Sequence, residues 1–298
     1  MNKTDICFCS VKETQTVLSS KKKNKNMKKL LLIISLICMS LAGFAQSEKT
    51  AILMVHFGTT EPEGRALSLE TVNNDVKAAF PEMEVRQAYA SAIIRNIWGK
   101  RGEHFYSPQE ALMQLRADGY ERVYVQSTTL MEGYEMTYLR EAIAALQPFF
   151  KELKAGNPLL YSVEDCQKVL DVLSQDAVEK NQAVVLVGHG TTHPSTAVYA
   201  MLQTMLQERE QGNWYVSTIE GYPTQEMTLK NLKQKKVKKV QLRPLLLTAG
   251  DHARNDIAKE WKELFEQQGF EVDVKLQGLG EIKAIRDIYI QHIKDILK

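Results

Sequence analysis

From Thr50 to the end of the chain, apolar runs of strand length alternate with longer segments whose apolar residues recur at helical spacing. This alternation is typical of βαβ units, in which each helix connects two parallel strands. The runs that predict strands are 51–57, 84–89, 123–126, 183–187, 214–218, 240–246 and 272–275. The helical patterns are 65–80, 108–118, 135–153, 164–180, 194–210, 224–236, 253–268 and 281–297. We therefore expect an α/β protein with parallel sheets.

A weak internal repeat divides this region into two halves. The segment VHFGTT at 55–60 resembles VGHGTT at 187–192, and each one ends the first strand of its half. The 298 residues are enough for two ordinary domains. A turn at Gly156-Asn157-Pro158 interrupts both periodicities. The sequence thus predicts two similar lobes with open sheets, an N-terminal lobe at 49–157 and a C-terminal lobe at 158–298.

The first 45 residues form an N-terminal extension of a different kind. Lys28 and Lys29 precede an apolar run at 30–38, and small residues follow up to Ala45. This order is typical of a secretory signal peptide, and the run is shorter than the roughly 20 residues of a membrane span. A lipoprotein signal at Cys38 is the alternative, which its bulky neighbours disfavour. We expect a signal peptide at about 27–45, export to the periplasm and no other membrane segment.

Charge and cysteine content follow from this interpretation. The whole chain has a net charge of +2, but residues 1–45 carry eight lysines and only two acids, so the remainder carries −4. The basicity that would favour nucleic acid as a partner therefore lies in the part that is removed, and no nucleic-acid binding is expected. Of the four cysteines only Cys166 remains, so no intramolecular disulfide is expected.

Two histidines follow predicted strands at positions where open parallel sheets bind their ligands, outside the carboxyl ends of the strands. His189 lies between two glycines after the run 183–187, and His252 lies in a Gly-Asp-His sequence after the run 240–246. Each has a local alternative: His189 belongs to a tight turn, and Asp251 beside His252 is a common helix cap. Two such histidines at one sheet edge favour a base or a metal ligand.

Glu220 follows a third predicted strand, 214–218, and would reach the same edge if the three strands are neighbours. A set of two histidines and one glutamate suits a divalent transition ion that keeps open positions for exchange. A closed structural zinc site would need a fourth ligand, usually cysteine. Taken alone, Glu220 is better explained as a solvated loop acid.

The other histidines are assigned structural or surface roles. His56 occupies nearly the place in the first half that His189 has in the second, and a structural role is favoured over that of an auxiliary ligand. His193 is expected to cap a helix, His104 to lie in a polar loop and His292 to lie on an exposed C-terminal helix. The sequence has no phosphate-binding loop, no dinucleotide fingerprint and no Gly-x-Ser-x-Gly elbow, so neither ATP nor NAD is expected.

Three motifs resemble one family, the anaerobic sirohydrochlorin cobaltochelatases. They are GHG at 188–190, IEGYP at 219–223 and LLLTAGDHARND at 245–256, and the resemblance extends from Phe57 to Glu281. The last motif is long and specific, whereas Gly-His-Gly alone would be weak. The resemblance implies a class II chelatase of two flavodoxin-like lobes, which works without ATP and holds a tetrapyrrole in the cleft between them.

The resemblance also implies that His189, Glu220 and His252 bind the metal. Co²⁺ is the expected substrate, with Fe²⁺ or Ni²⁺ as alternatives. We assign both histidines to metal delivery, with one of them also accepting a pyrrole proton, and Glu220 to coordination and charge balance. Which histidine is the base stays open, as does a homo-oligomer. The candidates for binding the carboxylates of the macrocycle, by position alone, are Arg95, Arg140 and Arg254.

The chain departs from the family pattern in three respects. Thr128 stands where relatives have histidine, and His56 stands where they often have serine. The signal peptide differs from cytoplasmic members of the cobalamin pathway and puts a role in corrin synthesis in question. The competing hypothesis is therefore an exported haem- or metal-binding carrier that serves uptake and uses the same residues.

Overall fold

The computed structural model describes residues 48–175, 178–209 and 212–298, of which Lys49–Lys298 forms one unit. The expected signal peptide and its cleavage site lie outside the described residues. Within the described ranges, none of the helices combines the length and the apolar character that crossing a bilayer requires.

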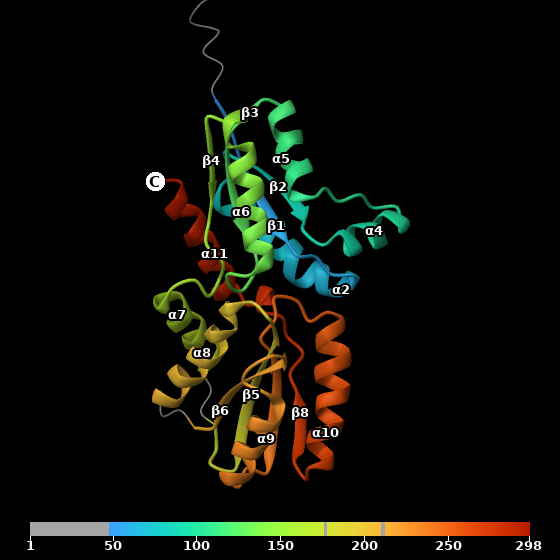
Figure 1. Cartoon of the computed structure of the whole chain (residues 1–298), viewed down its shortest axis with the longest axis vertical. Helices are drawn as coiled ribbons and strands as arrows, with labels where there is room; N and C mark the ends of the chain where they lie inside the picture. Colours follow the sequence, from blue (N-terminus) through green and yellow to red (C-terminus); the bar gives the residue numbers. More distant parts are fainter. Residues whose placement is uncertain (1–47, 176–177, 210–211) are drawn as a thin grey trace, which may run out of the picture. The chain divides into compact units, whose positions relative to one another are not determined.

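The first lobe is built on a parallel sheet with the strand order β2-β1-β3-β4 (Figure 1). Its central strand β1 is apolar without alternation because both of its faces are covered. Leu53 and Val55 pack against helices α5 (Pro108–Ala117) and α6 (Tyr134–Leu146), whereas Ile52 and Met54 pack against α3 (Thr71–Ala79) and α11 (Lys283–Ile296). The strands are β1 (Lys49–His56), β2 (Glu84–Tyr89), β3 (Tyr120–Ser127) and β4 (Glu152–Ala155).

Helices connect these strands, and several begin at the caps that their sequences provide. Ser107 and Glu110 form a reciprocal capping box at α5, and the Ser91 side chain caps α4. The elements are α2 (Pro62–Gly64), the π-helix η1 (Arg65–Glu70), α3 (Thr71–Ala79), α4 (Ala92–Lys100), α5 (Pro108–Ala117), α6 (Tyr134–Leu146) and the 3-10 turn η2 (Gln147–Phe149).

The second lobe repeats the first, because its parallel sheet has the order β6-β5-β7-β8. The prediction of two similar α/β lobes with parallel sheets is confirmed. The strands are β5 (Gln182–Gly190), β6 (Trp214–Glu220), β7 (Lys239–Pro244) and β8 (Glu271–Val274). The helical elements are α7 (Val163–Leu173), η3 (Pro194–Thr196), α8 (Ala197–Glu208), α9 (Gln225–Gln234), the π-helix η4 (Ala253–Trp261), α10 (Lys262–Gln267), η5 (Leu279–Glu281) and α11 (Lys283–Ile296).

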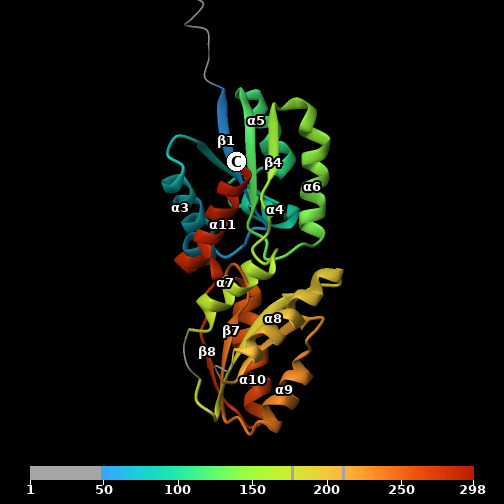
Figure 2. The ribbon, with the colours of Figure 1, turned by 90° about the vertical axis from the view of Figure 1, so that its left-hand side faces the viewer.

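Helix α11 belongs to the cores of both lobes. Its first half, with Ile285 and Tyr289, packs into the core of the second lobe, whereas Ile290 and Ile293 pack against β1 and α3 of the first. Figure 2 shows α11 beside α3. His292 was expected on an exposed face of this helix, and that expectation is wrong. The helix crosses the junction between the lobes, and His292 is buried there.

Two elements of the first lobe differ from the sequence prediction. The helical pattern at 135–153 ends as an α-helix at Leu146, and the chain then forms η2 and the edge strand β4. In β4 only Leu153 is fully buried, so four residues give too little alternation to predict a strand. Helix α4 was also missed. It buries only Ile94 and Trp98, which is a narrow apolar stripe.

Candidate active site

His189 is the penultimate residue of β5, which continues through Gly190 rather than ending at Val187 as the sequence predicted. The two flanking glycines are required by close contacts. A Cβ at Gly188 would stand 2.3 Å from the ring of Tyr199. Gly190 has φ +89°, and its backbone lies against Glu220 of β6. The glycines therefore let β5 extend to the sheet edge and carry His189 with it.

His252 meets His189 at this edge. It lies at the start of the helical segment that leads into η4, and the two imidazole rings are perpendicular, with their centroids 4.6 Å apart. The Nδ1 atom of His252 donates to Asp256 Oδ2 at 2.6 Å, and Nδ1 of His189 faces the Gly190 carbonyl oxygen at 3.2 Å. Because both partners are acceptors, each ring holds its proton on Nδ1 and keeps Nε2 as the free acceptor.

Glu220 is the last residue of β6 and is exposed. Its backbone pairs with Gly190, one residue from His189, so β5 and β6 are neighbours, as the prediction required. Its side chain does not complete a cluster, since among the described residues no group of three or more His, Cys, Asp or Glu side chains is arranged to hold a metal ion. The structure thus brings the two histidines together, while the role of Glu220 as third ligand stays a prediction.

Both histidines line a pocket of about 430 Å³ whose walls come from the two lobes. Much of the wall is apolar, including Phe57, Ile94 and Met131 of the first lobe and Leu247 of the second. The remaining wall is polar, with hydroxyl groups, backbone and a few acids. A ligand here would find apolar surfaces beside a pair of imidazoles.

Several contacts between described residues connect the lobes around this pocket. Thr60 donates its hydroxyl to Asp251 at 2.6 Å, directly beside His252. Arg254 forms an ion pair with Glu63 at 2.5 Å between partly exposed side chains. Tyr134, at the start of α6, stacks edge-to-face on His193 with centroids 5.2 Å apart. The pocket is therefore bordered by direct contacts between the lobes.

Comparison with protein-family models identifies the family of this chain. Residues 50–298 match the model described as cobalt chelatase (CbiK). The chain belongs to this family. It is 33% identical over 256 residues to the sirohydrochlorin cobaltochelatase of Salmonella typhimurium, covering 84% of this chain and 97% of that protein. It is 30% identical over 254 residues to the sirohydrochlorin cobaltochelatase CbiKC of Nitratidesulfovibrio vulgaris, covering 82% and 89%.

Solved structures share the architecture of this cobalt chelatase. SirB from Bacillus subtilis with Fe³⁺ superimposes with a TM-score of 0.61 at 15% identity, covering 83% of this chain and 95% of that one. The sirohydrochlorin chelatase SirB from Bacillus subtilis subspecies spizizenii in complex with cobalt gives 0.59 at 14% identity, with the same coverage. At this identity the likeness concerns the fold.

The three arginines proposed for the carboxylates of the macrocycle have protein partners in this chelatase. Arg95 donates to the Tyr89 and Ala90 carbonyl oxygens at 2.6 and 2.8 Å. Arg140 pairs with Glu132 at 2.5 Å, and Arg254 pairs with Glu63. None of the three is among the residues that line the pocket. Their role in substrate binding stays a prediction. To bind the macrocycle, each arginine would have to exchange its present protein partner for a substrate carboxylate.

His56 has the structural role that the sequence favoured, but it is not the counterpart of His189. Val55 pairs with the last residue of β3, and Val187 pairs with the last residue of β7. His56 therefore corresponds to Gly188, and Phe57 corresponds to His189. Successive side chains of a strand point to opposite faces, so this single step turns His56 into the core. It is fully buried, with Nδ1 2.9 Å from Thr128 Oγ1 and Nε2 3.0 Å from Asn73 Oδ1. Burial lowers the pKa of His56 to about 4.

Sequence reasoning missed two residues near the pocket. Asp256 holds the His252 ring, and its spacing of four residues along a helix was the available signal. Glu135 lines the pocket from the first turn of α6. Its exposure at a helix start is common for a glutamate, so the sequence gave no reason to select it.

Proposed function

We propose that this protein inserts Co²⁺ into sirohydrochlorin in the pocket between its lobes, with His189 and His252 handling the metal. The observation that carries the proposal is the imidazole pair, 4.6 Å between centroids, at the wall of a largely apolar pocket. Membership of the cobalt chelatase family supports the reaction, and the names of the two relatives support the macrocycle.

The arrangement suits the chemistry of insertion. The ion must be delivered with ligands that it can exchange, and the macrocycle must lose two pyrrole N–H protons. A neutral imidazole with a free Nε2 serves either task, because it is both a borderline ligand for divalent transition ions and a base near neutral pH. Apolar walls favour the faces of a flat macrocycle. Glu220 would add a negative charge at the same edge of the sheet and partly neutralise the incoming cation.

We further propose that the protein is exported by the signal peptide at 27–45. The support is the order of basic, apolar and small residues in that segment. An exported chelatase would meet its substrates outside the cytoplasm, so its macrocycle and metal are the first properties to measure.

The test is to incubate the purified protein with sirohydrochlorin and Co²⁺, Fe²⁺ or Ni²⁺ while following the absorption of the macrocycle. We expect cobalt insertion by the wild type and a loss of about 100-fold or more in the His189→Ala and His252→Ala variants, since each removes a group that acts on the metal. His104→Ala is the matched control, because that histidine is exposed and outside the pocket. Equal rates in wild type, variants and buffer would contradict the proposal. A tight haem complex without insertion would support the carrier instead.

A further inference from the structure

The two histidines of the site differ in what holds their rings. His189 faces a neutral carbonyl oxygen of its own neighbour, Gly190, at 3.2 Å. His252 is bonded to a carboxylate, Asp256, at the shorter distance of 2.6 Å. A hydrogen bond to an ionised acceptor is shorter and stronger than one to a neutral acceptor. The contact with Asp256 therefore restrains His252 more strongly than the carbonyl restrains His189.

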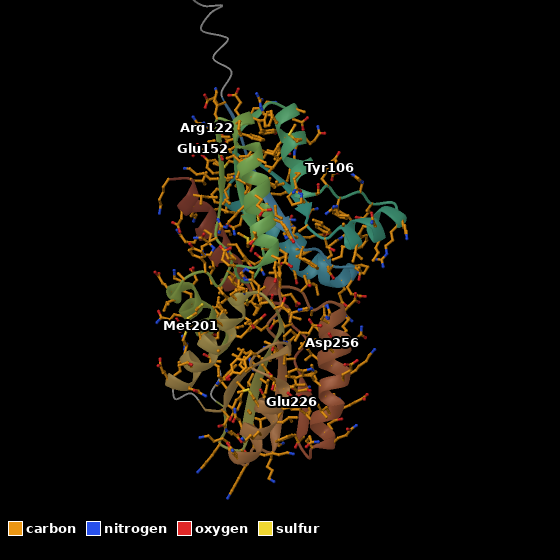
Figure 3. The ribbon with its side chains drawn as sticks, viewed as in Figure 1. Tyr106, Arg122, Glu152, Met201, Glu226 and Asp256 are labelled. Carbon is orange, nitrogen blue, oxygen red and sulfur yellow. The ribbon has the colours of Figure 1, made fainter. Side chains whose placement is uncertain are left out.

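Asp256 is placed for this contact by the helix. It lies within η4, four residues after His252, and this spacing puts both side chains on one face of a helix. Figure 3 labels Asp256 in the second lobe. The carboxylate is also the more protected partner: the Asp256 side chain is 23% exposed, against 57% for His252. The bond therefore anchors a half-exposed ring to a less exposed carboxylate.

The neighbouring charged side chains have other partners. Asp251 accepts from Thr60 of the first lobe, Arg254 pairs with Glu63, and Lys259 donates to Asn255. Of the two acids within four residues of His252, one thus connects the lobes and the other holds the imidazole.

From these contacts we propose that Asp256 is a positioning residue for His252, an inference that rests on the function proposed above. Asp256 keeps the proton of His252 on Nδ1 and fixes the ring plane, so that Nε2 is presented to the metal. A carboxylate in this position also makes the imidazole a stronger donor to a cation. Loss of such a partner typically costs about 10- to 100-fold in metal affinity.

The primary experiment is a titration of the protein with Co²⁺ in the absence of any tetrapyrrole, followed by the visible absorption of the bound ion. We expect Asp256→Ala to raise the dissociation constant about 10- to 100-fold. Asp256→Asn should cost less, because its amide oxygen can still accept the Nδ1–H bond. The matched controls are Glu260→Ala and Glu260→Gln, which remove an exposed carboxylate from the same π-helix and should leave the affinity unchanged.

A second measurement reports the tautomer directly. In ¹⁵N NMR spectra of the metal-free protein, the His252 ring is identified by its loss in His252→Ala, and it should have Nδ1 protonated and Nε2 unprotonated. Asp256→Ala should give a mixture of tautomers, whereas the Glu260 variants should not. If Asp256→Ala does not fold, Asp256→Asn and the wild-type spectrum still decide the question.

The possible failures are distinguishable. If His252→Ala binds Co²⁺ as tightly as the wild type, the metal site proposed above is wrong. If His252→Ala loses affinity but Asp256→Ala keeps both the wild-type affinity and the wild-type tautomer, the site stands and the role of Asp256 is wrong. A wild-type His252 ring protonated on Nε2 alone would also overturn the inference.

Discussion

Gly190 lies against Glu220 so closely that a Cβ on Gly190 would stand 1.4 Å from the carbonyl oxygen of Glu220. Gly190 also has φ +89°, which side chains of L-residues rarely tolerate. Two independent constraints thus act at one residue. Together they set the separation of β5 and β6 at the edge of the sheet, and with it the position of His189 next to the end of β6.

Substitution of this glycine should damage both the fold and the site. We expect Gly190→Ala to lower the free energy of unfolding by about 3 kcal/mol or more, since the clash is with backbone and adds to the strain of positive φ. Co²⁺ affinity should fall as well, because His189 moves. Gly269→Ala is the matched control: it has φ +90° but open space around the added Cβ, so it should cost only about 1 kcal/mol. Chemical denaturation of both variants measures the difference, and equal losses would contradict the role of the close contact.

The parts of the fold predicted from the sequence were those with a strong physical signal. β1 and β5 are apolar without interruption because they are central strands covered on both faces. β4 is an edge strand with one fully buried side chain, and its residues continued the helical pattern of α6. The path of α11 could not be predicted either, because an amphipathic helix does not specify which lobe it packs against.

The sequence predicted which residues of the candidate site lie at the ends of strands, but not the directions of their side chains. The rule that ligands bind at the carboxyl ends of parallel strands placed His189 and His252 together. The same rule cannot give the direction of a side chain, so it could not say whether Glu220 points toward the histidines. The six-letter repeat places His56 one residue before the position of His189, and in a strand that one residue separates a side chain in the core from one on the opposite face.

Burial of His56 should make the protein sensitive to acid. Burial lowers the pKa of this histidine from 6.5 to about 4 in the folded protein. Between these pH values the unfolded chain binds a proton at His56 and the folded protein does not. Above pH 6.5 the effect is absent. As the pH falls from 6.5 to 4 it should remove up to about 3 kcal/mol of stability. Unfolding by denaturant across this pH range measures the loss.

Two variants separate His56 from the other titrating groups. His56→Gln removes the titration, so its stability should decrease less between pH 6.5 and 4 than that of the wild type, whatever its stability at neutral pH. His104→Gln removes an exposed histidine and should retain the wild-type slope. If His56→Gln and wild type lose stability in parallel, His56 is not the group responsible.

His56 and Thr128, at whose positions the family resemblance implies other residues, are buried and in contact. Their side chains meet at 2.9 Å, Nδ1 to Oγ1. The family resemblance implies serine at position 56 and histidine at position 128, so exchanging both residues would restore one imidazole and one hydroxyl at this contact. We expect His56→Ser and Thr128→His each to destabilise the fold by about 2 kcal/mol, and the double variant to recover at least half of the summed loss. A double-mutant cycle measures this coupling, and additive losses would show that the exchange is not compensatory.

An ion pair between the lobes should hold α11 in place. Arg286 is buried, and its Nε donates to Asp75 of α3 at 2.7 Å, while Nη1 donates to the Gly280 carbonyl oxygen at 3.1 Å. Asp75→Asn leaves this buried cation without its counter-charge, so we expect a loss of about 2 to 3 kcal/mol in unfolding free energy. Asp287→Asn removes an aspartate on the exposed side of α11, paired with Lys283, and should change stability by less than about 1 kcal/mol. Similar losses in the two variants would show that the buried pair has no special role.

Glu220 is the one predicted metal ligand whose side chain does not join the histidine pair in the structure. Its substitution tests whether it binds the metal. If its carboxylate turns inward to the metal, Glu220→Gln should weaken Co²⁺ binding by about tenfold or more, because a charged oxygen ligand is replaced by a neutral amide. The imidazole pair would still bind, so affinity should fall further in the double variant with His252→Ala. Glu226→Gln at the start of α9 removes a nearby exposed carboxylate and should have no effect. If Glu220→Gln keeps the wild-type affinity and insertion rate, Glu220 is not a ligand and only His189 and His252 remain as supported protein ligands. Solvent or the macrocycle itself would then have to fill the remaining coordination positions.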